Sequence, residues 1–218
     1  MTPQNIANMA ALAGYDIIAV ADHNSTGNCK SVIEAAKHAG ILAVPAMELT
    51  TMEEVHVLCF LPTIDAAIEF GKYVYTKLPD IKNRKDIFGS QLYIDEHGEV
   101  LREEEKLLIS ATDIGIYDIY DLVKSYGGTA LPAHADRSSF SLISNLGFYD
   151  HAMRFPAIEL TENCDSHIFK QTHSIALPHI INSDSHNLEQ MPDAKNRIWL
   201  KHVSVNEVIQ ALDTGWNE

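Results

Sequence analysis

Short apolar runs alternate with helical patterns along most of the chain. Four such runs, at 16–21, 41–47, 129–133 and 179–183, are bounded by turn residues and predict buried parallel strands. Apolar positions at helical spacing predict helices at 31–39, 64–78, 114–126 and 205–214. Thr2 and Pro3 are typical of an N-cap and first helical position, so we expect a helix at the start of the chain. Together these patterns predict the α/β class.

Residues 80–113 interrupt this alternation. The stretches 91–94 and 99–101, separated by a polar turn, predict a small hairpin, and residues 103–108 predict a following helix. We interpret 80–113 as an insertion within one domain that spans residues 1–218, because no stretch has the composition of a linker. The insertion either covers the functional site or projects outward, and the sequence leaves both open.

Metal-ligating side chains recur where the apolar runs end. Asp22 and His23 follow the first run, Glu48 and then His56 follow the second, and the other two runs lead into Pro-Ala-His-Ala-Asp-Arg (132–137) and Ser-Asp-Ser-His (183–186). Imidazole and carboxylate groups bind zinc, manganese or iron and leave a position open for water. We therefore predict a metal-dependent hydrolase site at the C-terminal strand ends, with these ligands: His23, Glu48, His56, His134, Asp184 and His186.

Three residues beside the ligands are candidates for other roles at this site. Asp22 is expected to orient His23 or to contact a bound water, with a helix cap as the alternative. Arg137 is a candidate for bidentate phosphate binding and catalysis, with a surface salt bridge as the alternative. Asn24 is a weaker candidate for binding the substrate phosphate.

The order of these motifs resembles the PHP family, named for polymerase and histidinol phosphatase domains. The resemblance covers nearly the whole chain and implies a distorted, TIM-like seven-stranded β/α barrel that hydrolyses phosphoester bonds with up to three metal ions. It also implies that Glu48, His56 and His134 share one ion. Glu48 would bridge to a second ion with Asp184, and His23 and His186 would serve a third.

The chain departs from the family pattern at its front. The family opens with a strand that carries His-x-His, whereas this sequence begins with Met1 directly before the predicted first helix. We therefore expect the barrel to lack its first strand, through truncation, a misplaced start or true loss. We also expect the second ion to be bound weakly and phosphatase activity to be poor, because two ligands are missing.

Two other functional classes stay open. An amidohydrolase-like enzyme acting on C–N bonds uses similar histidines, but it usually adds a lysine on a strand, and we find none in that position. The second class is a metal-binding relic that has lost turnover. Activity measured with and without additional N-terminal sequence would separate these readings.

Composition limits the partners. The 218 residues carry a formal net charge of −14, which argues against extended nucleic-acid binding but allows a small phosphorylated substrate or a short nucleic-acid end. No apolar stretch approaches the length of a membrane span, and three cysteines give no disulfide framework, so we expect a cytoplasmic protein. One to three divalent ions are expected per chain, and exposed barrel edges would allow homo-oligomers.

Overall fold

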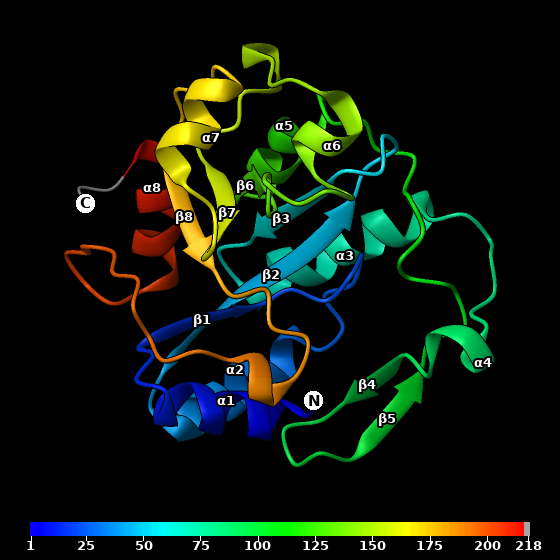
Figure 1. The fold of residues 1–218 in the computed structure, drawn as a ribbon. Helices are drawn as coiled ribbons and strands as arrows, with labels where there is room; N and C mark the ends of the chain where they lie inside the picture. Colours follow the sequence, from blue (N-terminus) through cyan, green and yellow to red (C-terminus); the bar gives the residue numbers. More distant parts are fainter. Residues whose placement is uncertain (216–218) are drawn as a thin grey trace.

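The structure, a computed structural model, describes residues 1–215 and combines helices with three separate sheets (Figure 1). The largest sheet has the order β1 (Ile17–Val20), β2 (Leu42–Thr50), β3 (His56–Phe60) and β6 (Thr129–Pro132). A parallel pair joins β7 (Ile158–Thr161) to β8 (His179–Asn182), and a hairpin joins β4 (Leu92–Ile94) to β5 (Val100–Glu103). The α/β class is therefore confirmed, although the strand ladders of residues 1–215 do not close into a barrel.

The direction of β3 differs from the expectation of parallel strands. β1 and β2 are parallel, but β3 runs antiparallel to both β2 and β6. Only residues 51–55 connect β2 to β3, whereas a parallel crossover needs about a dozen residues or more. Because β3 reverses, its first residue, His56, pairs with Thr50 at the edge where β2 ends. His56 therefore lies at the start of its strand and not, as expected, at the C-terminal end of one.

Most of the predicted helices form near their expected bounds. α1 (Pro3–Leu12) begins as predicted, because the Thr2 side chain accepts a hydrogen bond from the backbone of Asn5. α2 (Cys29–Ala39) and α3 (Ile64–Lys77) lie close to prediction, and α8 (Val205–Thr214) has the predicted bounds. Within residues 1–215, none of the helices has the length and apolar character that a bilayer crossing demands.

Two helical predictions need correction. α5 covers only Ile119–Ser125, because Glu53 accepts a hydrogen bond from the backbone of Ile116 and holds the preceding residues in a turn. The predicted helix at 103–108 does not form. The buried Glu104 carboxylate instead accepts hydrogen bonds from the next two backbone N–H groups, which keeps this segment extended and looped. The sequence patterns also missed several elements: α4 (Lys85–Phe88), α6 (Leu142–Leu146), α7 (Ser166–Thr172), η1 (His151–Met153), η2 (Leu188–Gln190) and strand β7.

Alternate residues of β2 face two different hydrophobic clusters. Met47 and Leu49 pack in the cluster that contains residues of α3 and α5, whereas Val44 and Ala46 pack in the cluster that contains residues of α8. Side chains alternate between faces along a strand, so Glu48 belongs to the second series. The face of β2 that carries Val44 and Ala46 is thus apolar up to Glu48, which places a carboxylate near the end of the strand.

The insertion rests on the loop that follows His23. The side chain of Asn28 bonds to the backbone of both Leu92 and Ile94, and Tyr93 contacts Ser25 at 3.1 Å between the hydroxyl oxygens. Figure 1 shows the β4–β5 hairpin at the periphery of the molecule. The observed contacts therefore give residues 80–113 a role in supporting this loop.

Asn24 connects the same loop to the rest of the insertion. Its side-chain Nδ2 donates to the carbonyl oxygens of Leu108 (2.7 Å) and Ser110 (2.9 Å), and its Oδ1 accepts from the backbone of Thr50 (2.9 Å). The side chain is 1% exposed and both amide hydrogens are used. This geometry argues against the phosphate-binding role expected for Asn24.

Replacement of Asn24 by alanine should lower the free energy of unfolding by about 2–4 kcal/mol, because it leaves buried backbone groups without partners. Asn145→Ala is a matched control, since that asparagine also donates to two backbone carbonyls but lies on the surface; its loss should cost less than about 1 kcal/mol. Urea unfolding of both variants measures the difference. Equal losses would contradict the structural role given to Asn24.

Candidate metal centre

One buried carboxylate lies among three histidines at the edge of the main sheet. Glu48 is 6% exposed, and its Oε1 lies 3.1 Å from Nδ1 of His56 and 3.3 Å from Nε2 of His134. Its Oε2 lies 3.3 Å from Nδ1 of His23. We call these four residues the Glu48 cluster. The two oxygens of one carboxylate therefore face different histidines.

Strand pairing explains how residues distant in sequence meet here. An isolated parallel bridge pairs His23 with Glu48, in which the backbone of Asn24 donates to the Glu48 carbonyl at 2.9 Å. His56 begins β3, next to the end of β2, and His134 follows the end of β6. β1, β2 and β6 run in one direction and β3 in the other, so all four residues reach the same edge.

Left-handed backbone conformations occur at three of the predicted ligand stretches. Asn24, His134 and Asp184 have φ angles of 47°, 30° and 46°. Residues other than glycine adopt this region at an energetic cost, and such residues concentrate at functional sites. Hydrogen bonds from surrounding groups must hold each of these turns.

The charges within the cluster suit metal binding. Burial would raise the pKa of Glu48, but the neighbouring His134 and His56 outweigh burial and hold that pKa well below its usual value. Burial lowers the pKa of His23 and so favours its neutral form. Burial also opposes a charge on His134, yet the nearby Glu48 carboxylate raises the pKa of His134 overall. An ionised carboxylate beside a neutral imidazole is a ligand pair that divalent metals prefer.

The distances within the cluster also fit a metal ion. Ligand atoms of His23, Glu48 and His56 all lie within 4.8 Å of one another. Two nitrogen or oxygen ligands at about 2.0–2.1 Å from a tetrahedral ion stand about 3.3 Å apart, close to the separations observed. Nδ1 of His134 is buried without a hydrogen-bond partner among the described residues.

Asp184 and His186 lie near the cluster but have other contacts. Oδ2 of Asp184 lies 2.5 Å from Nη1 of Arg137, and Nδ1 of His186 lies 2.9 Å from the Asp184 backbone oxygen. The charges of both residues act on the pKa of His23, which places them in its neighbourhood. The His186 side chain is 61% exposed. The structure thus joins four of the six predicted ligands directly and leaves Asp184 and His186 beside them.

The residues expected to assist the ligands have specific partners. Oδ2 of Asp22 accepts a hydrogen bond at 2.8 Å from Asn28, the residue before α2, and burial raises the pKa of Asp22. This contact ties Asp22 to the start of α2. Arg137 forms an ion pair with Asp184, which is one of the predicted metal ligands, and the arginine side chain remains 40% exposed.

Two further residues at the site were not identified from the sequence. The ring of Phe140 stacks on His56 with centroids 5.0 Å apart, and its carbonyl accepts a hydrogen bond from the His56 backbone. Glu159 is buried and accepts a hydrogen bond from the backbone of His134, and burial raises the pKa of Glu159 to about 7. A charged residue within the apolar run Ala157–Leu160 was a usable signal for Glu159. Phe140 carries no such signal.

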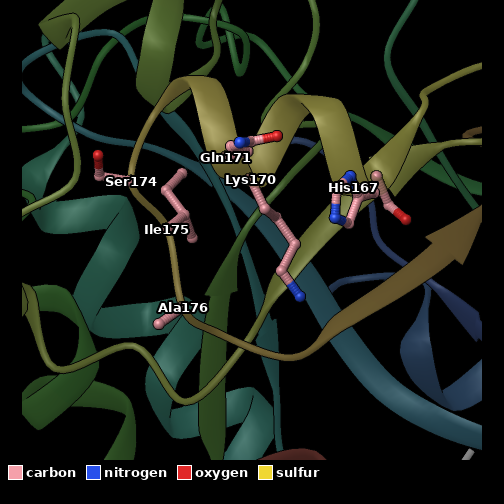
Figure 2. A pocket seen from close by; sticks show the side chains of 7 residues that line it. His167, Lys170, Gln171, Ser174, Ile175 and Ala176 are labelled. Carbon is pink, nitrogen blue, oxygen red and sulfur yellow. The ribbon is translucent and has the colours of Figure 1, made fainter.

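Two surface cavities differ in their relation to the cluster. One of about 540 Å³ is polar and includes Arg137, Asn182 and Ser183 in its lining. The other, of about 410 Å³, lies along α7, where Figure 2 shows the side chains of His167 and Lys170. Neither lining includes a predicted metal ligand, but the first cavity is lined by the candidate phosphate-binding residue Arg137 and by Ser183, which directly precedes Asp184. The first cavity is therefore the one that lies beside the predicted site.

Comparisons with known proteins identify the fold. No family model and no curated protein matches the sequence. Endonuclease Q from Pyrococcus furiosus, a lesion-specific endonuclease, superposes with a TM-score of 0.71 at 20% identity over 99% of this chain and 52% of that one. A proposed metal-dependent phosphoesterase from Bifidobacterium adolescentis gives 0.56 at 17% identity, covering 88% of this chain and 85% of that one.

An amidohydrolase from Chromobacterium violaceum, solved with bound sulfate and no metal, gives a TM-score of 0.57 at 16% identity over 97% of this chain and 92% of that one. The chain spans about half the length of the Endonuclease Q chain that it matches. At these identities the likeness concerns the fold. The chain therefore shares its fold with hydrolases, among them enzymes that act on phosphoester bonds.

Zinc affinity should fall as the pH decreases from 8 to 6. The raised pKa of His134 means that it keeps a proton at a pH where an ordinary histidine is neutral, so protons compete with the metal earlier. We expect about a tenfold loss of affinity per pH unit for each proton displaced. Titration with a zinc indicator at several pH values measures this slope. A constant affinity across the range would contradict the assignment of His134 as a ligand.

Proposed function

We propose that this chain is a metal-dependent hydrolase of phosphoester bonds. The observation that supports it best is the buried Glu48 carboxylate, with His56 and His134 at one oxygen and His23 at the other. A bridging carboxylate is the usual way to hold two ions close together. The likeness in fold to an endonuclease and to a proposed phosphoesterase supports the same class of reaction.

In this proposal the Glu48 cluster would hold the ions, and Asp184 and His186 would complete the ligand set. His56 and His134, beside Oε1 of Glu48, would share one ion with it, and His23, beside Oε2, would help to hold another. Bound zinc, manganese or iron would supply Lewis-acid activation of water and would neutralise charge on the phosphoryl oxygens. The donor set of imidazole and carboxylate suits all three metals.

Arg137 is proposed to bind the substrate phosphate. Its guanidinium lies in the lining of the polar cavity and is held by Asp184. A guanidinium matches the geometry of two phosphate oxygens, and an incoming phosphate would compete with Asp184 for it. This exchange would free the Asp184 carboxylate for a metal as the substrate enters.

The substrate class proposed is a small phosphate ester or a short nucleic-acid end. Endonuclease Q has been solved with a 27-mer duplex that carries an abasic lesion at the active site, which favours a nucleic-acid end. The net charge of −14 disfavours tracking along a long strand, so contacts would be confined to the polar cavity. The cytoplasm is the proposed location.

The fold proposed for the whole domain, residues 1–218 with an insertion at 80–113, is a distorted β/α barrel. Among the described strands, β1 pairs only with β2 and β8 only with β7, so each has an open edge. We propose that a strand carrying His-x-His pairs with one of these open edges in the active protein. The strand would come from the same protein or from a second copy.

His134→Ala should reduce zinc affinity by at least about 100-fold, because loss of a ligand costs more than loss of a residue that only hydrogen-bonds to a ligand. It should also abolish metal-dependent hydrolysis of a phosphate ester. His38→Ala is the control, because His38 is an exposed histidine on α2. Elemental analysis after zinc loading and dialysis gives the metal content. Wild-type levels of zinc in the His134 variant would exclude this cluster as the metal site.

Addition of an N-terminal strand with His-x-His should raise both metal content and turnover, since the extra ligands act on the same ions. The measurement compares residues 1–218 with the extended chain at saturating manganese, on phosphate esters and on amide substrates. A version with Ala-x-Ala in that strand is the control. Equal metal-dependent rates in all three proteins would contradict the role proposed for the strand, and turnover of amides alone would favour C–N hydrolysis.

A further inference from the structure

The site is divided between two sheets. The Glu48 cluster belongs to the four-stranded sheet, whereas Asp184 and His186 follow β8 in the parallel pair. No strand ladder connects β6 to β7 within residues 1–215. The relative position of the two halves must therefore depend on contacts other than regular strand pairing.

Glu159 makes those contacts from the middle of β7. Its Oε2 accepts a hydrogen bond from the backbone N–H of His134 at 2.7 Å, and its Oε1 accepts one from Nδ2 of Asn182 at 2.6 Å. Its backbone carbonyl accepts a third from the N–H of Ala135 at 2.8 Å. The residue is 4% exposed. One buried side chain thus links the ends of β6 and β8 through β7.

One link reaches the backbone of the predicted ligand His134, and the other reaches the side chain of Asn182, near the predicted ligand Asp184. His134 has a φ angle of 30°, a conformation that needs external support, and Glu159 bonds to the N–H of that same residue. Asn182 lies two residues before Asp184, which is also left-handed at 46°. A shift of the Glu159 carboxylate would displace both halves of the site.

We propose that Glu159 is a positioning residue that sets the distance between His134 and the Asp184–His186 stretch, so that both halves act on the same ions. This inference rests on the proposed function, because the side chains that it places are the proposed ligands. Both oxygens of the Glu159 carboxylate already accept these hydrogen bonds, so Glu159 is not proposed as a further metal ligand. Its effect passes through the backbone of His134 and the side chain of Asn182.

The test compares two substitutions at this position. Glu159→Leu removes both acceptors but keeps a side chain of similar bulk. Glu159→Gln keeps one acceptor for the His134 N–H, and its amide can donate to the oxygen of a flipped Asn182 side chain. Geometry alone therefore predicts rescue by glutamine, whereas a role for the negative charge predicts equal failure of both variants.

A control for stability is Asp213→Leu. The Asp213 carboxylate, in α8, accepts hydrogen bonds from the side chains of Tyr120, Lys124 and Thr129. Its replacement should lower thermal stability, because these hydrogen bonds are lost. It should leave the metal site intact, so comparison of the two variants separates general destabilisation from loss of positioning.

The measurements are the dissociation constant for zinc and the visible absorption spectrum of the cobalt-loaded protein, which reports ligand geometry. We expect Glu159→Leu to weaken zinc binding about 10–100-fold and to alter the cobalt spectrum, as outer partners of metal ligands typically do. Glu159→Gln should stay within about threefold of wild type, and Asp213→Leu should match wild type. Equal zinc affinity in Glu159→Leu and wild type would overturn the proposal, as would failure of the glutamine variant to rescue.

A measurement on the unaltered protein covers the case in which Glu159→Leu does not fold. The His134 N–H should exchange slowly with solvent in the metal-free protein, because Glu159 holds it. Rapid exchange of this amide, while the neighbouring β6 amides stay protected, would overturn the proposal. If wild type itself binds no zinc, the proposed function fails; if it binds zinc and only these predictions fail, the role of Glu159 alone is wrong.

Discussion

The buried carboxylate of Glu48 is the constraint on which the site depends. An ionised carboxylate away from water is costly unless positive charge or hydrogen bonds compensate it. Three histidines approach its two oxygens; the carboxylate raises the pKa of His134, so protonated His134 compensates it in part, whereas burial favours the neutral form of His23. A divalent cation would replace that proton and compensate the carboxylate while all three histidines stay neutral, and this is the physical basis of the proposed metal centre.

The surrounding backbone is arranged to bring ligands to that carboxylate. The short connection between β2 and β3 forces an antiparallel strand, and this reversal carries His56 back to the edge that Glu48 occupies. Left-handed turns at Asn24, His134 and Asp184 direct the chain at three other points of the site. The left-handed backbone at these turns costs free energy, and buried side chains such as Glu159 and Asn24 offset that cost through hydrogen bonds.

Local signals in the sequence were sufficient for several elements. The Thr2 and Pro3 pair sets the start of α1, and the Ser204 cap and Gly215 set the bounds of α8. Strand direction was not available from such signals, because apolar runs look alike in parallel and antiparallel pairs. The shortening of α5 depends on a hydrogen bond from Ile116 to Glu53, a contact distant in sequence. The helix expected at 103–108 failed for a similar reason, since Glu104 prefers buried tyrosine and backbone partners.

The candidate site likewise combines residues that local signals identify with residues whose contacts are distant in sequence. Residue type and position after an apolar run indicate His23, Glu48 and His134, whereas His56 reaches the same edge because its strand runs in the opposite direction. Phe140 and Glu159 escaped because their contacts depend on tertiary structure. Asn24 was given a chemical role, but its partners lie at the end of β2 and in residues 80–113, which no local pattern connects to it.

Anomalous diffraction from zinc-soaked crystals, recorded on both sides of the zinc absorption edge, tests the central claim most directly. The account predicts a zinc peak at about 2.0–2.2 Å from Oε1 of Glu48 and from nitrogens of His56 and His134. A second, weaker peak on the Oε2 side would agree with a bridging carboxylate. A fully zinc-exchanged crystal with peaks elsewhere, and none at Glu48, would contradict the account.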